Sequence, residues 1–352
     1  MMQRSLRALF MLILAAAIAP RTADAQVYPE RLNIKLTRAD AAYQRRDPDE
    51  REEQTERTIR TLRLGSTGEL AVGNVAGDIT ISRGGGADAK IEIVKVARGR
   101  SAEEAKELLD LVTVDIVERN GRADVKARYP SGDESRRNHR RNFNVTVSYT
   151  ITAPAGTRIT ANSVSGSVRV TDIKGELSAG TISGDVRIAS AGAIAAAKTV
   201  SGNVEILDAQ ADQGLEASSV SGDVTLRRIT ARRIDAGSVS GNVKLEDVQC
   251  ERAGAHSTSG NITFSGPLAK RGRYEFKSFS GEVHLAIGGG TGFEVDASTF
   301  SGDVRSDLPL TMRGGAGPDE RRRKRSLSGT YGDGSAVLEL SSFSGSIVIA
   351  KK

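Results

Sequence analysis

The sequence is poor in the residues that build disulfide scaffolds, zinc sites and aromatic cores. Its 352 residues include one cysteine, three histidines and no tryptophan, and aromatic residues make up 4%. A disulfide needs two cysteines, and a structural zinc site needs four cysteine or histidine ligands close together, so the composition excludes both classes. With eight prolines and no triplet period, the 38 glycines do not indicate collagen. A flexible glycine-rich chain and a β-rich repeat remain.

Long hydrophobic runs are also lacking. The main apolar stretch covers residues 8–19, follows Arg4 and Arg7, and is followed by an A-x-A motif that ends at Ala25. Twelve helical residues span about 18 Å of a hydrocarbon core about 30 Å thick. The pattern therefore predicts a secretory signal that is cleaved between Ala25 and Gln26. We expect an exported protein, periplasmic or at the cell surface, with no transmembrane segment in the mature chain.

Charge of one sign is in only mild excess. The formal net charge is +6, which is too small by itself to indicate a polyanionic partner, and export argues against nucleic acid. Two basic runs are candidate anion-binding loops: Arg136, Arg137, Arg140, Arg141, and Arg321, Arg322, Arg323, Lys324, Arg325. Solvated loops are the alternative. Docking to an anionic envelope polymer or lipid surface would weaken with added salt.

A Ser-Gly pair recurs nine times from Ser165 to Ser344. The first eight pairs follow one another at about 18–21 residues, and the gap before the ninth is about twice as long, which indicates a repeat architecture. A mostly apolar residue precedes each pair, and Val or Ile stands two positions after each glycine. The repeat glycines, with Gly77 of an earlier related segment, are Gly77, Gly166, Gly184, Gly202, Gly222, Gly241, Gly260, Gly281, Gly302 and Gly345.

The apolar positions within each repeat advance in steps of two, with an occasional step of three. Steps of two indicate a strand, and the extra residue indicates a corner. One such unit cannot bury its own apolar residues, so it stacks on its neighbours at about 4.8 Å. The predicted fold is all-β: a parallel, β-helix-like β-solenoid with rungs of about 18–21 residues and an N-terminal α+β capping insertion.

The alternation also predicts directions. We expect the apolar residue before each Ser-Gly pair and the Val or Ile after it to point inward, with glycine inward between them. Phe279, Phe300 and Phe343 would then stack inside the core and would not form a sugar-stacking platform. The polar residue after each glycine would face outward, where Asn ladders provide a structural reason for it. Calcium is the alternative there, but the glycine-rich nonapeptide of calcium-binding β-rolls is missing.

The segment before the array predicts a cap. A related rung lies around Gly77, and a long insertion separates that glycine from Gly166. Between them we expect a helix that Ser101 and Glu104 open as a capping box, and a hairpin with its turn at Asn120-Gly121. The expected elements are strands over 90–96, 112–117, 123–129 and 143–151 and the helix over 102–109.

Four parts follow from these features. The expected parts are a leader over 1–25, a charged segment or linker over 26–60, the first rung with its α+β cap over 61–150, and the solenoid repeat over 151–352.

No catalytic residue, cofactor or metal site is predicted. His139, His256 and His284 lack the spacing of paired ligands. Cys250 is expected to be buried. The serine of the Ser-Gly pair recurs nine times, which is typical of a structural residue and not of a catalytic nucleophile. Four arginines near Asp223 and Asp235 are interpreted as a solvated edge and not as a catalytic cluster; they are Arg227, Arg228, Arg232 and Arg233.

The segments NVAGDITI, SYTITAPAGTRITANSVSGSVRV and YGDGSAVLELSSFSG, with the repeated SVSGDV, resemble a bacterial putative-adhesin domain family. The resemblance covers about residues 60–352, with a departure at the insertion over 313–325. It implies an exported β-strand-repeat domain of unknown function, and it supplies no catalytic or binding residues.

The leading hypothesis is a non-enzymatic exported β-solenoid, an adhesin or binding scaffold at the cell envelope. Its partner would be an envelope polymer, a cell-surface glycan or a protein. One alternative is a carbohydrate-active β-helix enzyme, a hydrolase or lyase, which depends on fold analogy alone. Another is an envelope structural or stress-associated protein.

Overall fold

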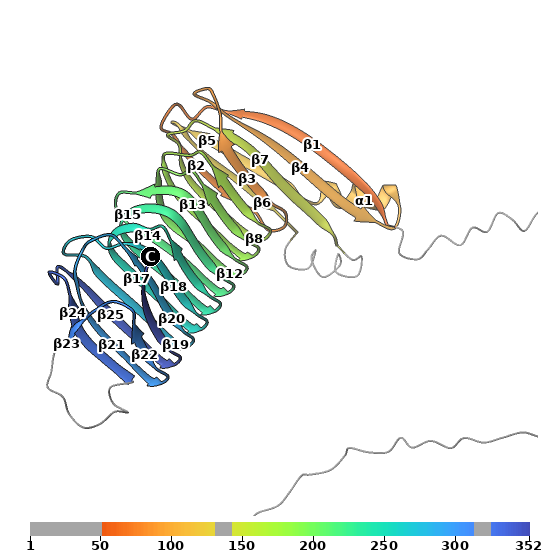
Figure 1. Cartoon of the computed structure of the whole chain (residues 1–352). Helices are drawn as coiled ribbons and strands as arrows, with labels where there is room; N and C mark the ends of the chain where they lie inside the picture. Colours follow the sequence, from red (N-terminus) through yellow and green to blue (C-terminus); the bar gives the residue numbers. More distant parts are fainter. Residues whose placement is uncertain (1–50, 131–142, 313–324) are drawn as a thin grey trace, which may run out of the picture. The chain divides into compact units, whose positions relative to one another are not determined.

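The computed structural model describes residues 51–130, 143–312 and 325–352 (Figure 1). In these ranges the chain forms 26 hydrogen-bonded strands and one helix, α1 (Ala102–Asp110). The all-β prediction is confirmed. The predicted leader and its cleavage position between Ala25 and Gln26 lie outside the described residues. No helix in the described ranges is long and apolar enough to cross a bilayer.

Seven strands precede the array. They are β1 (Glu52–Leu62), β2 (Glu69–Gly73), β3 (Ile79–Arg83), β4 (Ala89–Gly99), β5 (Thr113–Arg119), β6 (Arg122–Arg128) and β7 (Val145–Ala153).

The array has two layers of strands. Strands that end at a Ser-Gly serine are β8 (Arg158–Ser165), β10 (Glu176–Ser183), β12 (Ala193–Ser201), β14 (Leu215–Ser221), β15 (Val224–Ser240), β17 (Gln249–Ser259), β19 (Arg273–Ser280), β21 (Phe293–Ser301) and β25 (Ala336–Ser344). Strands that follow the glycine are β9 (Val168–Thr171), β11 (Val186–Ala189), β13 (Val204–Ala211), the first part of β15, β16 (Val243–Glu246), β18 (Ile262–Pro267), β20 (Val283–Gly288), β22 (Val304–Ser306) and β26 (Ile347–Lys351). Two short strands complete the chain, β23 (Thr311–Met312) and β24 (Ser326–Tyr331).

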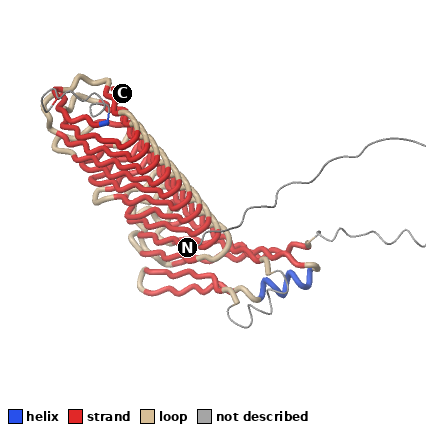
Figure 2. The backbone as a smooth tube through the Cα atoms, turned by 90° about the horizontal axis from the view of Figure 1, so that it is seen from below, coloured by secondary structure: helices blue, strands red, loops and turns tan. Residues whose placement is uncertain are grey.

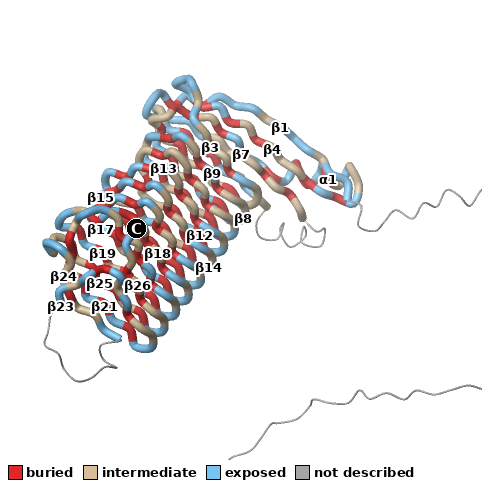
Figure 3. The backbone as a smooth tube through the Cα atoms, in the orientation of Figure 1, coloured by how far each residue is buried: buried red, intermediate tan, exposed pale blue. Residues whose placement is uncertain are grey.

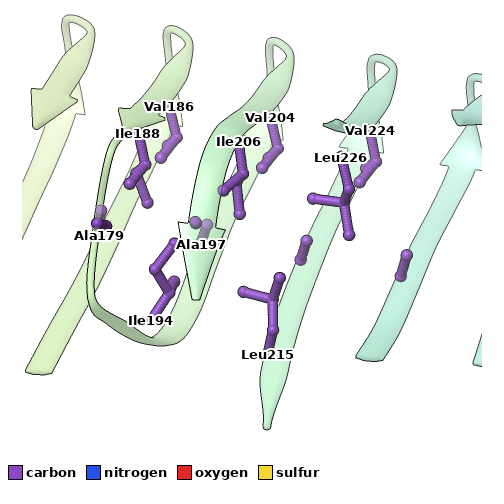
Figure 4. Packing of buried hydrophobic residues seen from close by; sticks show 14 of the residues in the cluster. Ala179, Val186, Ile188, Ile194, Ala197, Val204, Ile206, Leu215, Val224 and Leu226 are labelled. Carbon is purple, nitrogen blue, oxygen red and sulfur yellow. The ribbon is translucent and has the colours of Figure 1, made fainter. Parts of the chain in front are cut away.

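Equivalent residues of successive repeats lie side by side. Ser183 pairs with Ser165 and with Ser201, and Val186 pairs with Val168 and with Val204, all in parallel strands. The core lies between the two layers, where Val204, Ile206 and Ala197 are buried and repeat from rung to rung (Figures 3 and 4). The predicted stacking of identical positions is therefore present.

A second corner follows the second layer. Its residue has a left-handed backbone, with φ between +53° and +58°, in five successive repeats. These residues are Asp172, Ser190, Asp208, Arg228 and Asp247. The next residue turns inward, as Ile173 and Val248 do, which confirms the predicted steps of three at these places.

The last rung of the sequence is not the last rung of the stack. β25 pairs with β19 on one side and β21 on the other, and β26 pairs with β20 and β22. β21 and β22 therefore come before β25 and β26 in the sequence, but in space β25 and β26 lie between them and the rung of β19 and β20. β24 runs antiparallel along the outer side of β21.

The predicted first rung is confirmed. β2 pairs with β8 and β3 pairs with β9, and the Gly77 amide donates to the Ser165 carbonyl at 2.8 Å. On the other side β6 and β7 continue the two layers. The predicted hairpin joins β5 and β6, with positive φ at Asn120 and Gly121. The Ser101 hydroxyl caps α1 by accepting from the Glu104 amide.

The charged segment differs from the prediction. Residues 52–60, which the prediction assigns to the charged segment or linker, belong to β1, which pairs along its whole length with β4. Its charges pair across the sheet and do not need to be buried: Glu56 with Lys95 at 2.7 Å and Glu53 with Arg98 at 2.9 Å. β1, β4 and the start of β7 project past the edge at which the rungs turn, with α1 beside their outer end (Figures 1 and 2).

Candidate binding surface

The predicted direction of the residue before each Ser-Gly pair is wrong. Val164, Ile182, Val220 and their equivalents are exposed, and the buried position is one residue earlier. The chain turns its corner at the Ser-Gly pair, so two successive residues point to solvent before the Val or Ile two positions after the glycine enters the core. The buried residues are Ser163, Thr181, Thr199, Ser219, Ser238, Ser257, Ser278, Thr299 and Ser342.

These buried hydroxyls form hydrogen bonds between neighbouring rungs. The Thr181 hydroxyl donates to the Gly166 carbonyl at 2.9 Å, and Ser219 donates to Gly202 at 2.9 Å. The pattern continues through the stack to Thr299, which donates to the Gly345 carbonyl at 2.8 Å. The sequence carried this signal, because Ser or Thr stands three positions before every repeat glycine of the array.

Ser163 is the exception. The acceptor expected for Ser163 is the Gly77 carbonyl, but the Asn74 side-chain amide donates to that carbonyl at 2.8 Å. The same Asn74 amide also donates to the Val147 carbonyl. The Ser163 hydroxyl is therefore buried with no hydrogen-bond partner among the described residues. Asn74 occupies the corresponding position of the first rung and joins that rung to β7.

The repeat glycines are required by close contact between rungs. Gly222 has φ +154°, and a Cβ there would lie 1.9 Å from the Gly202 carbonyl oxygen. The nine repeat glycines from Gly166 onward would all place a Cβ within 2.4 Å of a neighbouring glycine carbonyl. The need for glycine is thus confirmed, but the contact lies along the stack and not toward the core, contrary to the predicted inward glycine.

The polar residue after each glycine also has a structural role. The Asp185 carboxylate accepts from the Asn203 amide at 2.9 Å, and the Asn203 side chain accepts from the Asp223 amide at 2.9 Å. Each side-chain oxygen thus bonds to the backbone of the next rung. In the described ranges no three His, Cys, Asp or Glu side chains are grouped to hold a metal ion.

The exposed residues before the Ser-Gly pairs form one straight row, which we call the apolar ladder. In spatial order it comprises Val75, Val164, Ile182, Val200, Val220, Val239, Thr258, Phe279, Phe343 and Phe300. Nine strand spacings of about 4.8 Å make it about 43 Å long. Apart from Thr258 every residue of the row is apolar, so the row is a candidate interaction surface.

Three phenylalanines stack at one end of the ladder. Phe279 and Phe343 have ring centroids 4.9 Å apart with planes at 1°, and Phe300 lies 4.8 Å beyond Phe343 with planes at 5°. Their exposed fractions are 57%, 47% and 64% in the order Phe279, Phe343, Phe300. The predicted internal aromatic ladder is therefore wrong: the rings stack, but on the outside. The expected inward direction of these three rings, which argued against a sugar-stacking platform on the surface, is wrong as well.

Mostly small residues flank the ladder and acids border it farther out. On one side run the exposed Ser-Gly serines, and on the other the residues two positions before the ladder, which are Gly, Asn or Ser except for Lys198, His256 and Lys277. The next outward position along the strands carries the acids Glu216, Asp235, Glu275, Glu339 and Asp296. Beyond the serines, the positions after the glycines carry Asp78, Asp185, Asp223, Glu282 and Asp303.

The arginines near Asp223 form ion pairs along the surface. Arg228 donates to Asp208 through two nitrogens, at 2.5 and 2.8 Å, and this pairing lowers the pKa of Asp208. Arg227 pairs with Glu246 at 2.6 Å. Arg233 pairs with Asp235 at 2.8 Å, and Arg232 is exposed. These contacts fit the predicted solvated edge.

Two surface hollows lie outside the ladder. One, of about 440 Å³, is lined by carboxylates of Glu294, Asp296 and Glu339 together with Lys277. The other, of about 480 Å³, lies between β1 and β4 on one side and β5 on the other. The first brings acids of β21 and β25 together, which the sequence did not show because β25 inserts out of order.

The remaining predicted residues are separate from the ladder or lie beyond the described ranges. Arg325 is exposed immediately before β24, whereas the other basic-run residues and His139 lie outside the described residues. His284 is exposed. Cys250 is buried as expected, and burial raises the pKa of its thiol to about 12.

Comparison with known proteins gives a family match over most of the chain and several solved structures of similar coverage. A family model described as Toastrack DUF4097 matches residues 69–350. No curated protein matches the chain. A "putative adhesin" from Bacteroides fragilis is 16% identical with a TM-score of 0.40, covering 83% of this chain and 96% of that one.

Two further solved structures match. A "putative lipid binding protein" from Parabacteroides distasonis is 14% identical with a TM-score of 0.45 and coverages of 83% and 96%. A "putative cell adhesion protein" from Clostridium sporogenes is 12% identical with a TM-score of 0.24 and coverages of 86% and 100%. At these TM-scores the likeness carries no argument about function.

Proposed function

The chain belongs to the Toastrack DUF4097 family, and we propose that it is an exported, non-enzymatic β-solenoid that acts as a binding scaffold at the cell envelope. The family match agrees with the resemblance to an adhesin-like repeat domain of unknown function. The observation that carries the proposal is the residue-for-residue register of the repeats, which places one kind of side chain at the same position in rung after rung. Such columns make a long, uniform surface suited to an extended partner.

The solenoid part of the proposal depends on the parallel pairings. Val168 pairs with Val186, and Val204 pairs with Val224, so each turn of the chain advances by one strand spacing. The hydrogen bonds between rungs support the expected rung length, since the bonded residues Ser167 and Asp185 are 18 residues apart in the sequence. The inserted β25 and β26 keep the same register although they come later in the sequence.

A capture experiment tests the scaffold role. Immobilised protein is incubated with solubilised envelope fractions, and the retained components are identified. We expect one recurring component, with the misfolded variant Gly222→Val as the control that should not retain it. Failure to retain any component from any fraction would count against the scaffold.

An activity screen tests the enzymatic alternative. The same protein is incubated with envelope glycans, and reducing ends or unsaturated products are measured. We expect no turnover. Turnover that Glu294→Gln or Asp296→Asn abolishes would overturn the proposal and place a reaction in the hollow beside β21.

Export is tested by fractionation. We expect the protein outside the cytosol, with a mature N-terminus at Gln26 by N-terminal sequencing. Retention of full-length protein in the cytosol would contradict the location that the proposal assigns.

A further inference from the structure

We propose that the apolar ladder is an interface at which a second copy of this chain packs, with the two ladders antiparallel. This surface goes beyond the proposed scaffold role, since it assigns the ladder to self-association and leaves other faces to other partners. The inference rests on the spacing, width, charge and shape of the ladder.

The spacing of the ladder favours a partner that carries the same row of side chains. The ladder repeats at the strand spacing of about 4.8 Å over ten rungs. A partner surface with any other period would fall out of step with the side chains within a few rungs. A second copy has the same period, so its side chains can pack between those of the first along the whole length.

The ladder and its flanking columns supply the central part of a dimer interface. The column two residues before the ladder is about 6.7 Å away and the serine column one residue after it is about 3.4 Å away, so the three columns are about 10 Å wide and about 43 Å long. This projected footprint of about 430 Å² does not count the sides of the protruding side chains. It is about half of the roughly 800 Å² per partner that standard interfaces bury.

The charge distribution matches the anatomy of a protein interface. The centre is apolar, the next columns are mostly serine and small polar residues, and acids such as Glu216 and Asp223 stand at the borders. Interfaces combine a centre depleted of charge with a polar rim.

Shape gives the direction of packing. In the antiparallel arrangement the large residues of one ladder face the small ones of the other: Phe300 faces Val75, Phe343 faces Val164 and Phe279 faces Ile182. The sum of the two facing side chains then varies less along the interface than it would in a parallel arrangement. In a parallel arrangement phenylalanines would meet phenylalanines and hold the aliphatic ends apart.

The projecting cap agrees with this direction. β1, β4 and the start of β7 extend past the edge at which the rungs turn (Figure 1). The Val147 amide of β7 donates there to the carbonyl of Ala76, the residue after Val75, at 2.8 Å. β7 pairs there with β4, from Val145 to Val147, in place of turning the corner as the rungs do. Parallel copies would bring both projections to the same end, where they would collide. Antiparallel copies place each projection beyond the last rung of its partner.

Mass measurement over a dilution series tests the interface. We expect the purified protein to be dimeric by sedimentation or light scattering. The triple variant F279S/F300S/F343S should raise the dissociation constant by about thirtyfold or more, because it removes the large aromatic side chains from both ends of the interface. Thr258→Val should lower it by a few fold. The control is Val117→Ser on β5, because Val117 and Val220 are both 45% exposed.

The acids at the borders of the ladder predict how the stability of the dimer depends on salt. Antiparallel packing places Asp185 near Glu282 of the second copy, and Asp78 near Asp303. Added salt screens this repulsion, so we expect it to strengthen the dimer, whereas attachment through the basic loops would weaken.

Cysteine pairing tests the direction. Ser183 and Ser280 are exposed beside Ile182 and Phe279. Mixing Ser183→Cys protein with Ser280→Cys protein under mild oxidation should give a mixed disulfide. Each variant alone should give none, because its two copies would be about 24 Å apart. The reverse result would overturn the antiparallel arrangement.

The proposal fails if the unsubstituted protein is monomeric at every concentration, or if the folded triple variant dimerises unchanged. Far-ultraviolet circular dichroism shows whether that variant is folded. If it is not, the Thr258→Val and cysteine results decide. A monomer that still retains an envelope component would overturn the interface and leave the scaffold role intact.

Discussion

The hydroxyl three positions before each repeat glycine sets the direction of the corner. A serine or threonine there can enter the core because its proton meets a carbonyl of the neighbouring rung, as with Ser238 and Gly222 at 2.9 Å. A buried hydroxyl without an acceptor is costly. The apolar residue that follows then points to solvent, where it joins the ladder.

One substitution pair tests this role. Ser219→Ala removes a bonded hydroxyl and leaves the Gly202 carbonyl without its partner, so we expect a loss of about 1 kcal/mol in the free energy of unfolding. Ser163→Ala removes a hydroxyl that has no partner among the described residues, so we expect no loss or a small gain. Urea denaturation of both variants measures the difference. Equal losses would show that the hydroxyl bonds do not stabilise the stack.

Substitution should destabilise the protein far more at Gly222 than at Asp223, the residue after it. Gly222→Ala forces a Cβ into the Gly202 carbonyl oxygen at 1.9 Å, so we expect a loss of more than about 3 kcal/mol. Asp223→Asn keeps the oxygen that accepts from the Asn242 amide, and should change stability by less than about 0.5 kcal/mol. Thermal unfolding compares the two.

The control for the glycine is Gly180→Ala. Its Cβ would lie 3.1 Å from the Asn162 side-chain oxygen and 3.7 Å from the Lys198 carbonyl oxygen, and Gly180 lies within a strand. We expect it to be neutral or mildly stabilising. The opposite order of Gly222 and Asp223 would contradict the contact described between rungs.

At the scale of the element, local signals in the sequence predicted most strands, the helix and the hairpin. The capping box at Ser101 and the turn at Asn120 act within a few residues, so they could be found without the fold. The direction of Val164 and its equivalents could not, because alternation predicts two faces of a strand but is interrupted at a corner. β1 was missed because its charges pair with β4, a contact 39 residues away for Glu56 and Lys95.

The helix is the element most open to a simple test. The Ser101 hydroxyl accepts from the Glu104 amide at 3.2 Å, and the Glu104 carboxylate accepts from the Arg100 amide at 2.7 Å. Ser101→Ala should therefore destabilise α1 by about 1 kcal/mol, and Ser101→Asp should restore most of it. Hydrogen exchange of the α1 amides measures the effect. Equal protection in Ser101→Ala would show that packing of Leu108 and Leu109 alone holds the helix.

At the scale of the whole molecule, the order of the stack could not be predicted. Every rung presents nearly the same parallel edge, so the sequence does not say which rung is neighbour to β19. The double-length gap before the last Ser-Gly pair was the one sign of irregularity. In the structure, the rung formed last by the sequence lies between two others, and its Phe343 completes the aromatic stack between Phe279 and Phe300.

This order makes the C-terminus an internal support of the stack. Deletion of residues 336–352 removes β25 and β26, which are one of the two parallel neighbours of β19 and β20 and the parallel neighbours of β21 and β22. In a repeat protein stability depends on contacts between neighbouring rungs. We therefore expect hydrogen exchange to lose protection in β19 to β22, while β8 to β14 keep theirs.

The matched control deletes only Lys352. That residue contributes a bond from its amide to the Ile287 carbonyl and an ion pair with Asp247, so its removal should cost about 1 kcal/mol or less. If β25 were instead a terminal rung, the longer deletion would merely shorten the stack and leave β21 protected. Unchanged protection of β21 after the longer deletion would therefore contradict the inserted order, since β21 would have no parallel neighbour left among the described strands.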